Sequence, residues 1–106
     1  MKTTTAALIL IATLAGTKAI DSRLLVTIPS CVDATTWGAS FTSTCADFQP
    51  AIDDGNTYAG ALFEDCDYSG KNCDTKARVS CSYTDPDGNA VYYTQDVVES
   101  LGGSLA

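Results

Sequence analysis

The chain has 106 residues, with thirteen aspartates and glutamates against six lysines and arginines, five cysteines and no histidine. The formal net charge of −7 repels nucleic-acid phosphates and anionic membrane surfaces, so the composition argues against nucleic-acid binding. Without histidine, the chain cannot form a Ser–His–Asp triad, a Cys–His dyad or a histidine-ligated metal site.

The amino-terminal residues show the order of basic charge, apolar run and small side chains that is typical of a secretory signal peptide. The apolar run, Ala6–Ala15, is shorter than the roughly 20 residues of a membrane-spanning helix, so we expect no membrane insertion. Small side chains at Thr17 and Ala19 suit cleavage after Ala19, and a similar pair a few residues earlier offers a second position. We therefore predict a signal peptide over 1–19 and one secreted, extracellular domain over 20–106.

Cleavage would leave four basic and thirteen acidic residues, or −9, on a domain too small for a large core. Secreted domains of this size depend on disulfides, each of which contributes about 2–4 kcal/mol. An odd number of cysteines allows at most two internal disulfides and leaves one thiol over, and spacing alone does not choose the pairs. All the cysteines lie in the predicted domain: Cys31, Cys45, Cys66, Cys73 and Cys81.

The first half of the domain predicts two strands separated by a loop. The continuous apolar and β-branched run Leu24–Ile28 predicts a covered strand. The small, polar residues of Asp33–Ser40 predict a loop. The alternation in Ser40–Phe48 predicts a second strand, with Phe41 and Cys45 on one side.

The middle of the domain predicts a third strand between a turn and an acidic loop. Asp53–Asn56 has turn composition, and Thr57–Phe63 follows as a strand in which Gly60 indicates a bulge. A short helix is the competing prediction for Thr57–Phe63. The polar residues Glu64–Thr75 predict a loop that holds two cysteines.

The clearest element is a β-hairpin over 77–94. Ala77–Thr84 alternates strictly, and its inward side holds Val79, Cys81 and Tyr83. Asp85–Gly88 has the composition of a type I turn, and Ala90–Thr94 returns as a strand. The end, Thr94–Leu101, suits a short helix or a continued strand equally. The predicted fold is all-β or β-rich α+β, a small disulfide-stabilised single domain.

The hairpin also suggests a disulfide pairing. Cys81 lies in mid-strand and points into the core, and we prefer Cys45 as its partner. Cys31 would then pair with Cys66 or Cys73, and the other of these two would remain the free thiol.

No residue pattern predicts catalysis, a cofactor or a metal ion. Several carboxylates could supply the general acid and base of glycoside cleavage, but they are better explained as residues of solvated acidic loops. These carboxylates are Asp53, Asp54, Glu64, Asp65 and Asp67. Asp85–Asn89 or Asp65–Asp67 could supply oxygen ligands to calcium. However, the residues of Asp85–Asn89 are already explained as those of a turn, and the glutamate that ends an EF-hand loop is missing. The cysteines lack the paired short spacings of a zinc site.

The aromatic residues are the candidate partner contacts, because flat rings with a polar tip often contact sugars and proteins. The candidates are Trp37, Tyr68, Tyr92 and Tyr93. The last two are adjacent in a predicted strand and must point to opposite faces, so one of them should be exposed.

The signal peptide, short domain, several cysteines and lack of a catalytic motif resemble the small secreted cysteine-rich proteins of fungi. This resemblance implies a non-enzymatic effector- or toxin-like protein that binds a protein or glycan outside the producing cell, including after delivery to a host. A cell-wall surface protein is a further alternative.

Three segments resemble the cyanovirin-type lectin repeat. Phe41–Cys45 matches its F-x-x-T-C entry, Leu62–Cys66 matches its L-x-x-x-C strand ending, and Val79–Leu105 is hairpin-like with a terminal Gly-Ser-Leu. This resemblance implies a carbohydrate-binding module as the alternative function. A longer Cys45–Cys66 gap and the extra Cys73 and Cys81 depart from the repeat.

Overall fold

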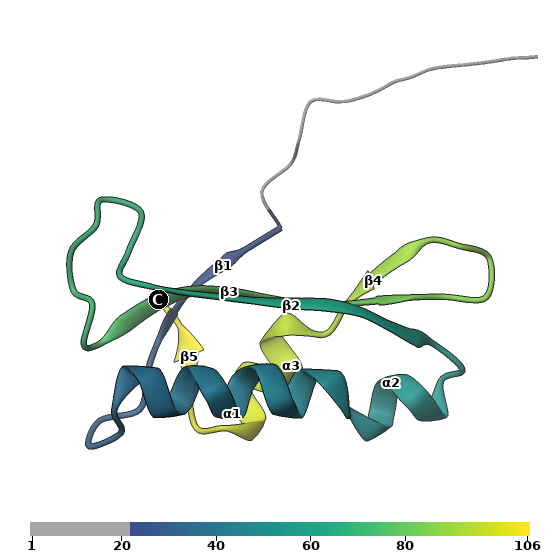
Figure 1. Cartoon of the computed structure of the whole chain (residues 1–106), viewed down its shortest axis with the longest axis horizontal. Coiled ribbons are helices and arrows are strands. Elements are labelled where there is room, and N and C mark those ends of the chain that lie inside the picture. Colours follow the sequence, from purple (N-terminus) through teal and green to yellow (C-terminus); the bar gives the residue numbers. More distant parts are fainter. Residues whose placement is uncertain (1–21) are drawn as a thin grey trace, which may run out of the picture.

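The computed structural model describes residues 22–106, so the predicted signal peptide over 1–19 lies outside the described residues. Figure 1 shows two layers, with the helices gathered on one side of a β-sheet. The elements in chain order are β1 (Leu24–Thr27), α1 (Ala34–Ala46), α2 (Gln49–Asp53), β2 (Thr57–Asp65), β3 (Lys76–Thr84), β4 (Ala90–Tyr92), α3 (Thr94–Ser100) and β5 (Ser104–Leu105). The fold is a β-rich α+β domain, as predicted.

The sheet is antiparallel and is organised around β3. β2 pairs with β3 along one side, while β1 pairs with the first half and β4 with the second half of its other side. β5 extends the sheet beyond β1. The strand with the strictest alternation in the sequence is therefore the one that contacts most of the sheet.

The predicted hairpin is confirmed in β3 and β4. Val79, Cys81 and Tyr83 are fully buried, as their alternation predicts. In the turn, the Asp85 carboxylate accepts hydrogen bonds from two backbone amides, and Gly88 has a φ of 88°. β4 ends at Tyr92 because the next residues turn into α3, so the final segment is a helix.

The predicted loop Asp33–Ser40 and strand Ser40–Phe48 are wrong, because α1 covers most of both segments. Trp37, Phe41 and Cys45 recur at intervals of four, so on a helix they share one buried face. The Asp33 side chain caps this helix by accepting the Thr36 amide at 3.0 Å. Many β-branched and small residues weaken the helical signal in this segment.

Smaller differences concern the ends of elements. Pro50 lies in the first turn of α2, where its missing N–H costs nothing, and does not simply end a strand. β2 runs two residues further than predicted, through Asp65, and its register shifts between Tyr58 and Gly60, which confirms the bulge.

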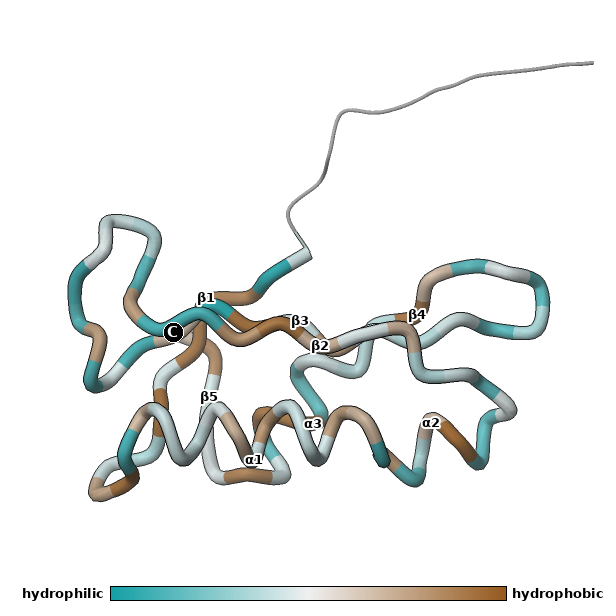
Figure 2. Tube along the Cα trace, in the orientation of Figure 1, coloured by the Kyte–Doolittle hydropathy of each residue, from teal (hydrophilic) through white to brown (hydrophobic). Residues whose placement is uncertain are grey.

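The core lies between the sheet and the helices. Trp37 is 3 % exposed, and its indole N–H donates to the Leu101 carbonyl at 3.2 Å, which joins α1 to the end of α3. In Figure 2 brown segments follow β1 and β3, while the loops after β2 and β3 are largely teal. The other buried apolar residues are Val26, Ile28, Phe41, Cys45, Phe48, Ala51, Ala77, Val79, Cys81, Tyr83, Tyr93, Val97 and Val98.

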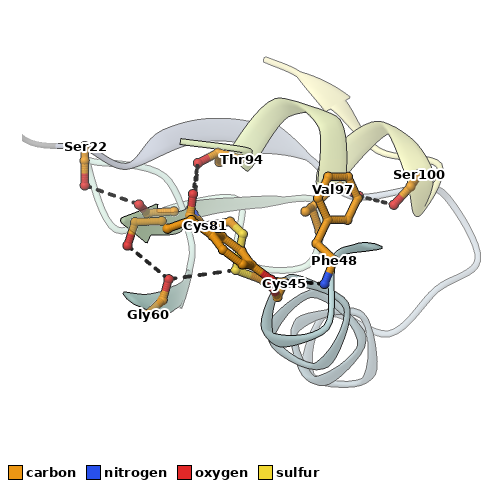
Figure 3. Close-up of a disulfide and its surroundings, with 11 residues drawn as sticks. Ser22, Cys45, Phe48, Gly60, Cys81, Thr94, Val97 and Ser100 are labelled. Atoms are coloured by element: carbon orange, nitrogen blue, oxygen red, sulfur yellow. Dashed lines mark hydrogen bonds between the residues drawn. A yellow bond between two sulfur atoms is a disulfide. The ribbon is translucent and has the colours of Figure 1, made fainter. Parts of the chain in front are cut away.

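The end of α1 is tied to β3 at two adjacent points. Cys45 and Cys81 form a disulfide, with 5.7 Å between their Cα atoms, as predicted (Figure 3). Next to it, the buried Tyr83 hydroxyl donates to the Cys45 carbonyl at 2.6 Å and accepts the Phe48 amide at 3.1 Å. This hydroxyl therefore satisfies two buried backbone groups at the junction of α1 and α2.

The remaining cysteine prediction is wrong. Cys66 pairs with Cys73 across the loop after β2, and Cys31 is an exposed free thiol. Cys66 and Cys73 are only seven residues apart in one loop, whereas Cys31 lies in the separate loop between β1 and α1.

Tyr83→Phe should destabilise the domain by about 2–4 kcal/mol, because it leaves a buried carbonyl and a buried amide without their partner. Tyr92→Phe makes the same chemical change on an exposed side chain and should cost less than about 0.5 kcal/mol. Urea unfolding of both variants measures the difference. Equal stability of the two variants would contradict this account of the α1–α2 junction.

A thiol-alkylating reagent should modify Cys31 alone in the native, oxidised protein, because the other four cysteines are bonded in pairs. Mass mapping of the non-reduced digest should recover Cys45 linked to Cys81 and Cys66 linked to Cys73. A Cys31→Ser variant is the control and should take up no label. Labelling of Cys81 would refute the pairing.

Candidate binding surface

The sheet has one face without helices, which we call the open face. All three helices lie on the opposite side of the sheet (Figure 1). Since Val79, Cys81 and Tyr83 point towards the helices, the alternate residues of β3 point to the open face. Residues paired directly across strands share a face, so the open face comprises Leu25, Leu62, Glu64, Arg78, Ser80, Ser82 and Tyr92.

Two large apolar side chains stand on the open face. Leu62 on β2 is 53 % exposed and Tyr92 on β4 is 54 % exposed. They pair with Ser80 and Ser82 of β3. Because these serines are short, the leucine and the tyrosine are accessible to a partner.

A charged cluster joins three strands on the same face. Glu64 of β2 forms ion pairs with Arg23, which precedes β1, and with Arg78 of β3. Both guanidinium groups lie 5.8 Å from the ring centre of Tyr68, within cation–π range. The Tyr68 hydroxyl donates to the Arg23 carbonyl at 3.1 Å. The cluster therefore holds Tyr68 against the sheet, although this residue remains 55 % exposed.

The loop that presents Tyr68 is closed by covalent and polar bonds. The Cys66–Cys73 disulfide joins its ends. Between them, the Asp67 carboxylate accepts from the Ser69 hydroxyl at 2.6 Å, the Lys71 amide at 3.0 Å and the Asn72 side chain at 2.8 Å. These hydrogen bonds stabilise the carboxylate and hold the pKa of Asp67 well below its usual range.

The structure divides the predicted contact aromatics into two groups. Tyr68 and Tyr92 are exposed at the open face, whereas Trp37 and Tyr93 are 3 % and 9 % exposed and belong to the core. The expectation that one of the adjacent tyrosines is exposed is therefore confirmed. The buried Tyr93 hydroxyl donates to Asp54 and accepts from Asn56, and burial raises the pKa of this phenol.

The sequence interpretation does not single out Leu62 or the two arginines. Alternation along β2 is the signal that places Leu62 on the side opposite Phe63. No local pattern pairs Arg23 with Glu64, because the antiparallel register of three strands brings them together.

The predicted carboxylates do not converge. Asp53 and Asp54 end α2, whereas Glu64 and Asp65 end β2, so the two groups are separated by the length of β2, about 25 Å. Paired carboxylates of glycosidases lie about 5–10 Å apart. Within residues 22–106, no three histidine, cysteine or acidic side chains are grouped in a way that could hold a metal ion.

The two disulfides indicate an oxidising, extracellular environment. Among the helices of residues 22–106, none is both long and apolar enough to cross a membrane. No family model, curated protein or solved structure matches the chain.

The Asp67 carboxyl group should titrate well below the ordinary aspartate value of 3.8. Because the folded loop favours the carboxylate, the stability it adds is complete above that value and is lost as the pH falls towards the folded pKa. A ¹³C NMR carboxyl titration down to about pH 2 tests this, because an ordinary aspartate titrates within that range whereas Asp67 should stay largely ionised through it. Asp67→Asn is the control and removes the titration, while its amide oxygen can still accept from Ser69 and Lys71. An ordinary midpoint for Asp67 would contradict the described loop.

Proposed function

We propose that the protein is secreted after cleavage near Ala19 and acts without catalysis, as an effector- or toxin-like domain that binds a target protein. The observation that carries the proposal is the gathering of exposed Leu62, Tyr68 and Tyr92 on the side of the sheet that the helices leave uncovered. Large apolar and aromatic side chains that are exposed together are typical of binding surfaces.

The three side chains are also held in place before any partner binds. Leu62 and Tyr92 lie on strands that both pair with β3, and Tyr68 is held by the Arg23–Glu64–Arg78 cluster and the closed loop. A side chain that is already ordered loses less conformational entropy when a partner binds. The open face is therefore prepared for contact with a partner.

Carbohydrate binding is the second candidate function. Tyr68 and Tyr92 both present exposed rings, and such rings can contact sugars as well as proteins. The resemblance to the cyanovirin-type repeat points in the same direction. A protein partner remains the first proposal because Leu62, an apolar residue without a polar tip, lies on the same face.

The test begins with the oxidised protein as bait against extracellular extracts of candidate hosts and competitors, with a glycan array in parallel. The double variant Leu62→Ser/Tyr92→Ser should bind the identified partner at least about tenfold more weakly, because two exposed contact side chains are lost. Ile52→Ser is the matched control, since Ile52 is exposed on α2, away from the open face.

Unchanged binding by the double variant, or an equal loss in Ile52→Ser, would contradict a role for the open face. Saturable binding to a glycan, with no protein recovered from the extracts, would favour the carbohydrate-binding function. Amino-terminal sequencing of the secreted protein tests the cleavage prediction and should begin at or near Ile20.

A further inference from the structure

β2 forms one margin of the sheet, and part of its backbone faces away from every described strand. It pairs only with β3. The backbone N–H of Cys81 donates to the Thr94 hydroxyl, and its carbonyl accepts the Tyr93 amide, so the backbone groups of Cys81 point away from β2. Ala61 is the partner of Cys81 in the register, so this is a pair without hydrogen bonds and the N–H and C=O of Ala61 point outward.

The same alternation applies along the strand. The Cys66 amide donates to the Lys76 carbonyl, so the even-numbered residues at this end of β2 bond to β3. The backbone groups of Phe63 therefore also point outward, beside those of Ala61. No described residue donates to or accepts from these outward groups, and no residue of β2 is buried. The edge offers two donors and two acceptors to an added strand.

Carboxylates lie at both ends of this edge. Asp53 and Asp54 precede β2, and Asp65 ends it; within residues 22–106 none of the three forms an ion pair. The helices on the covered side contain no basic residue. A strand that carries lysine or arginine would therefore meet carboxylates at each end: the Asp53–Asp54 pair at one, and Asp65, beside the Arg23–Glu64–Arg78 cluster, at the other.

A second copy of this chain fits the edge poorly. Two β2 strands paired antiparallel around Ala61 would place Asp65 of each strand opposite Thr57 of the other, which the Asp53–Asp54 pair precedes in the chain. The bulge between Tyr58 and Gly60 also disturbs the first part of the edge, so the regular stretch is short. Like charges at both ends and a short ladder disfavour self-association.

We propose that the outer edge of β2 binds an extended, basic segment of a partner protein. The segment adds a strand by pairing its main chain with Ala61 and Phe63, and its basic side chains approach Asp65 and the Asp53–Asp54 pair. This inference goes beyond the proposed function, because the edge and the open face are separate surfaces. Main-chain pairing supplies the affinity, and charge selects the segment.

The test uses the oxidised, ¹⁵N-labelled protein and a nine-residue peptide of alternating lysine and valine. On binding, the Ala61 and Phe63 amides should shift, and their hydrogen exchange should slow at least about tenfold. A peptide of alternating glutamate and valine should not bind. A lysine–valine peptide N-methylated at every residue keeps the charge, lacks the donors, and should bind at least about tenfold more weakly.

Two variants locate the interaction on the protein. Ala61→Pro removes an outward donor without removing a bond to β3, and should weaken the lysine peptide at least about tenfold. Tyr92→Ser alters the open face on β4, which β3 separates from β2, and should bind the lysine peptide normally, so failure of the proposed function and failure of this inference can be told apart. The N-methylated peptide needs no variant, so the test stands even if Ala61→Pro folds poorly.

Equal binding of the N-methylated or glutamate peptide would overturn the proposal, as would amide shifts confined to residues outside β2. Slowed hydrogen exchange at the Ala61 and Phe63 amides could also appear without peptide and increase with protein concentration. That result would show that a second copy of the chain occupies the edge instead.

Discussion

The bond between α1 and β3 is the constraint on which the rest of the structure depends. A domain this small has a modest core, and its longest helix contains no charged residue that could fix its position by ion pairs. The Cys45–Cys81 disulfide joins the helix to the central strand over a sequence separation of 36, for which the chain-entropy model gives about 3–4 kcal/mol. The Tyr83 hydroxyl then sets where the helix ends, since it bonds to both sides of the α1–α2 junction. One face of the sheet is thereby committed to the core.

That commitment leaves the other face free for binding. β3 has its apolar residues on one side and Arg78, Ser80 and Ser82 on the other, so the open face needs no cover for its own stability. Leu62 and Tyr92 are the exceptions, because both are large, apolar and more than half exposed there. Neither side chain contributes much to the core, and their exposure is more readily explained by contact with a partner than by folding.

The sequence predicted local features well and long-range ones poorly. The β3–β4 hairpin depends on strict alternation and a turn that contains Gly88, and both signals are local. The apolar residues of the Phe41–Cys45 segment fit a period of two or of four equally well, and its two threonines favoured the strand. Packing of α1 against β2 and β3 is what decides for the helix. The Cys45–Cys81 pairing was nevertheless predicted, because Cys81 points inward in either case. Cys31 was wrongly paired because no sequence signal indicated that Cys66 and Cys73 pair with each other within one loop.

Tyr68 shows how weak surface interactions become useful for binding. Exposed ion pairs such as Arg23–Glu64 contribute little to stability in isolation, so they alone would leave a tyrosine in a long loop with many conformations. The Cys66–Cys73 disulfide and the Asp67 hydrogen bonds shorten and shape that loop independently of the sheet. The arginines then need only orient one ring on a segment that is already ordered. The entropy of ordering Tyr68 is therefore lost during folding, and it does not reduce the affinity for a partner at the open face.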